Sequence, residues 1–137
     1  MKLKHLLIAF LATTSLLLGS CSKELELSGT TWTGTAYTEG TDGSNLYEYT
    51  QNYIMRFSDD KSGYIDINMT YTVNGGSQQL GPSGSLKFTY TFVGKEGKME
   101  ATNQNTGQPI IDVFRYDEET QIITLYDGGV VVELKQK

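Results

Sequence analysis

The sequence is poor in the residues that most often bind metals or act as nucleophiles and bases, with one cysteine and one histidine among 137 residues. The cysteine is Cys21, so zinc sites built from several cysteines and histidines are excluded. The histidine is His5, near the N-terminus, so Ser-His-Asp and Cys-His mechanisms lack their base in the rest of the chain. We therefore expect no enzyme, no catalytic residues, no metal and no other cofactor.

Basic residues are also scarce, with 11 Lys and Arg against 16 Asp and Glu and a formal net charge of −5. Lys2 and Lys4 precede Cys21, so the remainder of the chain is more acidic still. Such a surface repels nucleic acid and anionic lipid headgroups. We expect no nucleic-acid partner, and any attachment to a membrane should use a lipid anchor instead of a basic patch.

The N-terminus has a short basic start followed by an apolar stretch over residues 6–18. Spanning a bilayer takes roughly 20 apolar residues, so this shorter stretch is typical of an export signal. It ends in Leu18-Gly19-Ser20-Cys21, which resembles the lipobox of bacterial lipoproteins. The resemblance implies a cleaved signal over residues 1–20, lipidation of Cys21 and a lipidated tether over residues 21–27. The alternative is an ordinary signal with a chance cysteine.

Ser22 follows the cysteine at the position where an Asp retains enterobacterial lipoproteins at the inner membrane. This resemblance therefore implies an outer-membrane lipoprotein of the cell envelope, on the periplasmic face or on the cell surface. Residues 22–26 also resemble the Lys- and acid-rich tether of some surface-exposed lipoproteins. The alternative is a merely polar tether.

Residues 28–137 show no internal repeat and form one domain of strand-like runs separated by turn signals. In residues 64–73 apolar and polar residues alternate, so Ile65, Ile67, Met69 and Tyr71 should share a buried face. We expect long loops over residues 39–45 and 74–84 and a tight hairpin at 127–129. The predicted strands cover residues 30–38, 46–58, 64–73, 85–93, 98–103, 109–116, 121–126 and 130–135.

The connections between these eight runs are too short for parallel crossovers, which indicates an antiparallel meander. Each run has one apolar face to bury, and closing the sheet into a barrel buries those faces and removes exposed edges. The predicted fold is an all-β, eight-stranded antiparallel up-and-down barrel. The alternative is an open β-sandwich.

Two segments carry a family resemblance. Leu27-Ser28-Gly29-Thr30-Thr31-Trp32-Thr33-Gly34 resembles the first strand of lipocalin-like domains. Residues 114–117, 122–129 and 134 are similar to the closing strands of small lipocalin-like (calycin-type) bacterial lipoproteins. The resemblance covers most of residues 27–137 and implies a lipocalin-like barrel with a non-catalytic binding domain for a small apolar or amphipathic ligand.

Aromatic residues are abundant, and they either pack the core or line a ligand pocket. Large inward side chains favour a small or absent cavity. If the domain is instead a scaffold that binds another envelope or extracellular protein, residues 39–45 and 74–84 are the natural contact sites. The candidate ligand-binding residues are Trp32, Tyr53, Tyr71, Tyr90 and Phe114.

Asp112 is unusual because it lies inside an apolar run. We expect Ile111 and Val113 to point inward and Asp112 to face water; in the alternative reading, Asp112 is a polar group inside a cavity. Four acids near the C-terminus offer oxygen ligands for calcium but lack EF-hand spacing, so an acidic hairpin tip is expected instead. They are Asp117, Glu118, Glu119 and Asp127.

Overall fold

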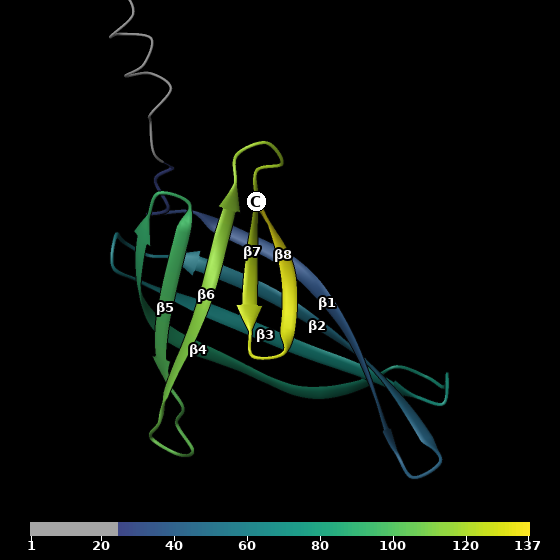
Figure 1. Ribbon diagram of the computed structural model, residues 1–137. Coiled ribbons are helices and arrows are strands. Elements are labelled where there is room, and N and C mark those ends of the chain that lie inside the picture. The colour runs from purple at the N-terminus through teal and green to yellow at the C-terminus, as the bar shows by residue number, and fades with distance from the viewer. Residues whose placement is uncertain (1–24) are drawn as a thin grey trace, which may run out of the picture.

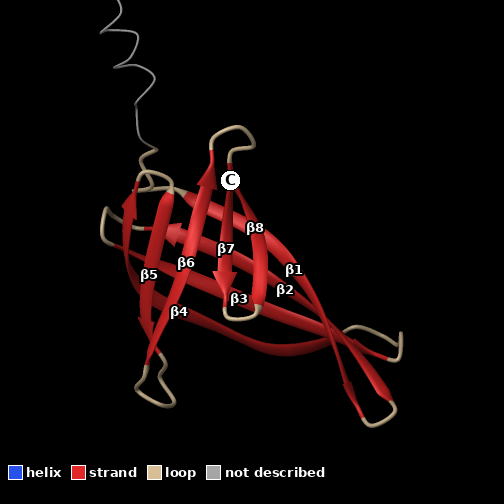
Figure 2. Ribbon diagram, in the orientation of Figure 1, coloured by secondary structure: helices blue, strands red, loops and turns tan. Residues whose placement is uncertain are grey.

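The computed structural model describes residues 25–137, so the predicted signal and Cys21 lie outside the described part. Each strand pairs antiparallel with the next, and β8 pairs back with β1 to close a barrel (Figures 1 and 2). This confirms the eight-stranded antiparallel barrel and excludes the open sandwich. The strands are β1 (Thr31–Asp42), β2 (Asn45–Phe57), β3 (Ser62–Val73), β4 (Gln79–Val93), β5 (Glu96–Thr102), β6 (Pro109–Asp117), β7 (Ile122–Asp127) and β8 (Val130–Gln136).

Alternation along β2 and β3 sets the inward face of the sheet. Met55 and Ile65 are direct cross-strand partners, and both are buried. Ile67 is only partly buried and packs against the core from the same face. The four predicted side chains of residues 64–73 therefore share one face, as expected, but only Ile65 is buried, and Met69 and Tyr71 farther along β3 are partly exposed. No helix in residues 25–137 has the length and hydrophobicity to cross a membrane.

One end of the barrel is closed by aromatic packing. The ring centroids of Phe57 and Tyr90 lie 4.9 Å apart, and those of Phe57 and Phe114 lie 5.7 Å apart. Residues 25–30 cover this end, where Leu27 is buried and its carbonyl accepts a hydrogen bond from the Thr30 hydroxyl. Leu27, assigned to the tether by the sequence, is thus part of the core.

Close packing at this end requires a glycine at position 97. A Cβ built on Gly97 would lie 2.0 Å from Cζ of Phe114, which has no exposed surface. Gly97 and Phe114 are also cross-strand partners on β5 and β6. The ring therefore fills the space that a side chain on β5 would occupy.

The other end of the barrel is open, because β1–β4 are longer than β5–β8. In β1 only Trp32 and Thr33 are registered with β8, and β4 is registered with β5 only from Thr89 onward. The remaining parts of β1–β4 continue beyond the closed part of the barrel as a twisted sheet, which we call the projecting sheet (Figure 1).

The tight hairpin predicted at 127–129 is confirmed, with Gly128 at φ 59° between β7 and β8.

The two predicted long loops are wrong, because the projecting sheet includes most of them. β1 continues to Asp42 and β2 begins at Asn45, so residues 39–45 form a hairpin with a two-residue turn. β4 begins at Gln79 despite Pro82. The pairing of β3 with β4 shifts register here, and Pro82 has no partner in it. A proline is compatible with a strand at such an irregularity because no ladder hydrogen bond is lost.

Candidate functional site

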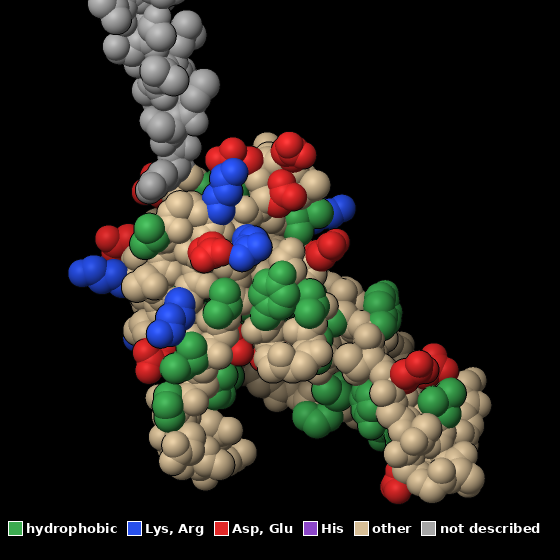
Figure 3. Space-filling view, in the orientation of Figure 1, with side chains coloured by type: hydrophobic (Ala, Val, Ile, Leu, Met, Phe, Trp, Pro, Cys, Tyr) green, Lys and Arg blue, Asp and Glu red, His purple; other side chains and the backbone are tan. Residues whose placement is uncertain are grey.

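A hollow of about 510 Å³ lies at the open end, between β3, β4 and the β5–β6 connection. Its apolar wall comes from the inward side chains of β3, β4 and β6, and its rim carries the amides of residues 103–105. Figure 3 shows the molecule hollowed below the barrel, between the β5–β6 hairpin and the projecting sheet. The apolar lining residues are Ile65, Ile67, Met69, Leu86 and Ile110.

The expected orientation of Asp112 is wrong. Ile111 and Val113 are 53% and 47% exposed, whereas Phe114 is fully buried, so Asp112 belongs to the inward face. Its cross-strand partner on β5 is Met99, which is also buried. β6 is apolar on both faces, and the larger rings of Phe114 and Tyr116 occupy the interior. The alternative reading, with Asp112 as an inward polar group, describes its placement.

Asp112 meets a second acid from the end of β7. Burial, followed by the negative charge of Asp127, raises the pKa of Asp112 to about 6. The hydroxyl of Tyr53 donates a hydrogen bond to Oδ2 of Asp127 over 2.9 Å. Burial, and then the same carboxylate, raises the pKa of Tyr53, so this hydroxyl stays protonated. Asp112 therefore holds its proton in mildly acidic solution, and the two carboxyl groups together offer acceptors to a donor at the open end.

The structure does not bring the five predicted ligand-binding residues together. Trp32 and Phe114 are buried in the core, and the Trp32 indole donates a hydrogen bond to the Thr30 hydroxyl. The Tyr90 hydroxyl donates to the carbonyl of Asp59 at the closed end. Tyr53 is buried beside Asp112 and Asp127, which we call the acidic pair. Of the five residues, only Tyr71 is partly exposed, and it lies on the projecting sheet.

Tyr71 has two aromatic neighbours that the sequence reasoning did not select. The ring centroids of Tyr47, Tyr49 and Tyr71 lie 6.1–6.3 Å apart, and we call these three residues the tyrosine cluster. Gln51 follows Tyr49 on the same face, and its cross-strand partner is Met69 of the hollow. Alternation in residues 46–58 was the signal that could have identified this row.

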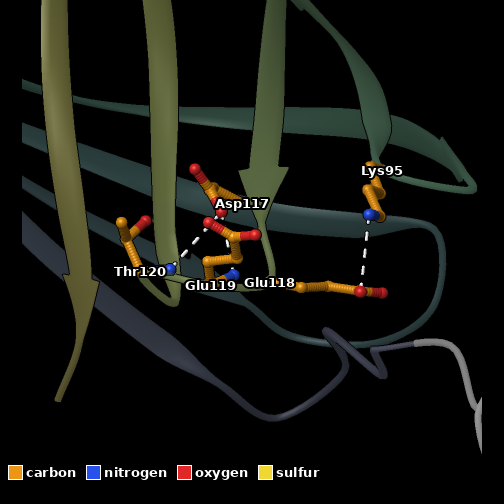
Figure 4. Close-up of polar contacts among 5 residues, drawn as sticks. All are labelled: Lys95, Asp117, Glu118, Glu119 and Thr120. Atoms are coloured by element: carbon orange, nitrogen blue, oxygen red, sulfur yellow. Dashed lines mark hydrogen bonds and ion pairs between the residues drawn. The ribbon is translucent and has the colours of Figure 1, made fainter.

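The acids considered for calcium lie at opposite ends of β6 and β7. Oδ1 of Asp117 accepts backbone N–H groups of Glu119 and Thr120 and so stabilises the β6–β7 turn, while Glu118 pairs with Lys95 at 3.4 Å (Figure 4). Asp127 lies at the far end, beside Tyr53. Within residues 25–137 the structure contains no group of three or more acidic, histidine or cysteine side chains suited to a metal ion.

Comparison of the chain with protein-family models, with curated proteins and with solved structures found no match.

Proposed function

We propose that the chain is a non-catalytic lipoprotein, anchored through Cys21 in the outer membrane, whose barrel binds a small amphipathic ligand at its open end. The observation that carries the binding role is the hollow of about 510 Å³, with apolar walls and an amide-bearing rim. A few polar groups on an apolar concave surface are typical of small-molecule sites. The proposed ligand therefore lies at the mouth of the barrel, whereas the closed end is packed core.

The first described residues, which follow Cys21 closely, lie at the closed end of the barrel, opposite the hollow. Leu25 and Leu27 pack at the closed end, beside Tyr90 and Phe92. Cys21 precedes Leu25 by four residues, which reach at most about 14 Å when extended. A lipid on Cys21 therefore holds the closed end against the membrane and turns the hollow away from it.

The binding role is tested with phenylnaphthylamine, a neutral apolar fluorophore, titrated into the soluble domain. The matched pair is Ile110→Gln, inside the hollow, and Ile111→Gln, on the outer face of the same strand. Ile110→Gln should weaken binding about tenfold because it removes apolar contact area, and Ile111→Gln should leave it unchanged.

A second variant separates a blocked site from a damaged fold. Gly84 is exposed in the lining of the hollow, faces inward opposite Ile67, and has no atom within 4 Å of an added Cβ. Gly84→Trp should therefore obstruct the hollow while the melting temperature stays near that of the unaltered protein. No fluorescence change in the unaltered protein, or equal affinity in all three variants, would contradict the proposal.

A second candidate function is an interaction module for another envelope or extracellular protein. An apolar patch on the outer face of β6–β8 favours it (Figure 3). Val113 partners Tyr126, and Tyr126 partners Val131, so these exposed side chains are contiguous with each other and near Ile111. Contiguous exposed apolar surface is a common mark of protein contact sites.

Photo-crosslinking in cells tests whether the apolar patch on β6–β8 contacts another protein. A photoreactive residue at Val131 should give a reproducible adduct of one size, and the same residue at Leu80, an exposed position on the projecting sheet, should not. Equal or absent adducts at the two positions would rule the patch out as the contact surface.

A further inference from the structure

The inward face of the barrel continues, uncovered, onto the projecting sheet. Along β2 the inward row runs from Tyr53 through Gln51 to Tyr49 and Tyr47, away from the core. On β3 the row from Ile67 and Met69 of the hollow continues to Tyr71. The hollow and the tyrosine cluster therefore form one continuous surface.

This surface is aromatic and polar, and besides Asp112 and Asp127 the only acid that alternates to this face of β1 and β2 is Asp42, at the tip of β1. Cross-strand registration puts Thr38 beside Tyr49, and Gly40 beside Tyr47. The Tyr71 hydroxyl donates a hydrogen bond to Oε1 of Gln79 over 3.0 Å. The facing acids of this part of the sheet, Glu39 and Glu48, alternate to the opposite face. A ligand on the tyrosine side meets rings, hydroxyls and amides.

Gln51 supplies an independent indication of a ligand. Its Oε1 is buried and accepts no hydrogen bond. An unpaired buried acceptor is costly, and a donor beside it recovers that cost. Gln51 lies between the tyrosine cluster and Tyr53, so this acceptor sits where the cluster meets the open end of the barrel.

We propose that the tyrosine cluster, together with Gln51 and the rim of the hollow, binds a neutral saccharide. Sugar rings present C–H groups on one face and hydroxyls around the edge, so they pack on aromatic rings while donating to amide oxygens. The tyrosines offer the rings, and Gln51 offers the unpaired acceptor. The inference rests on the proposed binding role and names the polar half of its ligand.

The probes are neutral hexasaccharides of glucose, xylose, mannose and N-acetylglucosamine at millimolar concentration, with hexagalacturonate as the charged comparison. Saturation-transfer NMR detects contact, and a titration monitored by tyrosine fluorescence gives the affinity. At least one neutral hexasaccharide should bind, and hexagalacturonate should bind less well because the protein is acidic.

Substitutions locate the binding surface. Tyr49→Ala and Tyr71→Ala should each weaken saccharide binding about tenfold, because each removes one stacking ring. Tyr37→Ala is the matched control: Tyr37 is 78% exposed and lies on the opposite face of the same sheet, so affinity should not change. Melting temperatures of the three variants show that each is folded.

The outcomes separate this inference from the proposed function. If phenylnaphthylamine binds in the hollow but no neutral hexasaccharide binds, the saccharide inference is overturned and the amphipathic site stands. The inference also fails if a hexasaccharide binds with equal affinity to the Tyr49→Ala, Tyr71→Ala and Tyr37→Ala variants. If neither probe binds, both proposals fall.

Discussion

The hydroxyl of Tyr53 donates a hydrogen bond to Asp127 over 2.9 Å, and so links the middle of β2 to the end of β7 across the open end of the barrel. The two residues are 74 positions apart. Asp112 adds a second carboxyl group to the same place, and burial together with Asp127 raises its pKa to about 6.

The first prediction is that Asp112 makes the protein more stable in mild acid than at neutral pH. Between its ordinary pKa of 3.8 and about 6, the folded protein keeps a proton that the unfolded chain releases. The contribution of Asp112 to the free energy of unfolding therefore falls as pH rises through this window and is constant above it. The change is about 1–2 kcal/mol, below the full value of the shift because Asp112 is partly exposed.

Urea unfolding at several pH values checks this in the unaltered protein and in Asp112→Asn. The contribution is the difference between the two, because other carboxyl groups also titrate. Hydrogen bonds from Lys61 and Ser62, for example, lower the pKa of Asp59, which destabilises the protein at still lower pH. Asp42→Asn, at the exposed tip of β1, is the control and should keep the slope. An unchanged slope in Asp112→Asn would contradict the prediction.

The second prediction concerns the phenol itself. Tyr53→Phe removes the donor to Asp127 and leaves a partly buried carboxylate with one partner fewer, so it should cost about 1–2 kcal/mol of unfolding free energy. Tyr64→Phe removes a hydroxyl from an exposed ring on β3 and should change stability by less than about 0.5 kcal/mol. Equal shifts in the urea midpoints of the two variants would show that the hydrogen bond contributes nothing.

The barrel was predictable because polar and apolar residues alternate strongly in strands that form its inward face. Ile65 lies in a run whose polar and apolar residues alternate cleanly, and the turn glycine at 128 marks a hairpin. Asp112 was not predictable in the same way, because β6 is apolar on both faces and only the size of Phe114 decides which face enters the core. Local pattern carries no information about that competition.

The candidate site at the open end depends on the lengths of the strands, which the local sequence does not predict. Pro82 and its neighbouring glycines read as a loop, yet they lie in β4 because the register shift opposite β3 accommodates them. The projecting sheet, which carries the tyrosine cluster, exists because β1–β4 are longer than β5–β8. Such a difference emerges only when all eight strands are in register.

The third prediction tests the anchor. Cys21→Ser removes the thiol that the proposed lipid would occupy, so the protein should accumulate with its signal uncleaved and without a lipid. Mass spectrometry of the purified protein and metabolic labelling with a fatty acid measure both properties. Ser20→Ala keeps a small residue before the cysteine and should be lipidated and cleaved normally. A Cys21→Ser protein that is cleaved and membrane-bound like the unaltered protein would end the lipoprotein proposal.

The last prediction tests the packing that closes the other end of the barrel. Gly97→Ala puts a Cβ 2.0 Å from the Phe114 ring, which has no free space into which it can turn. Relief requires β5 and β6 to separate or Phe57 and Phe92, both packed on the same ring, to shift. We expect a loss of about 3 kcal/mol or a failure to fold. Gly84→Ala is the matched control within a strand, because no atom lies within 4 Å of its added Cβ. It should change stability by less than about 1 kcal/mol, in either direction, since alanine restricts the unfolded chain. Urea midpoints that agree for the two variants would mean that β5 and Phe114 do not pack as described, and a soluble but unfolded Gly97→Ala protein would support the packing.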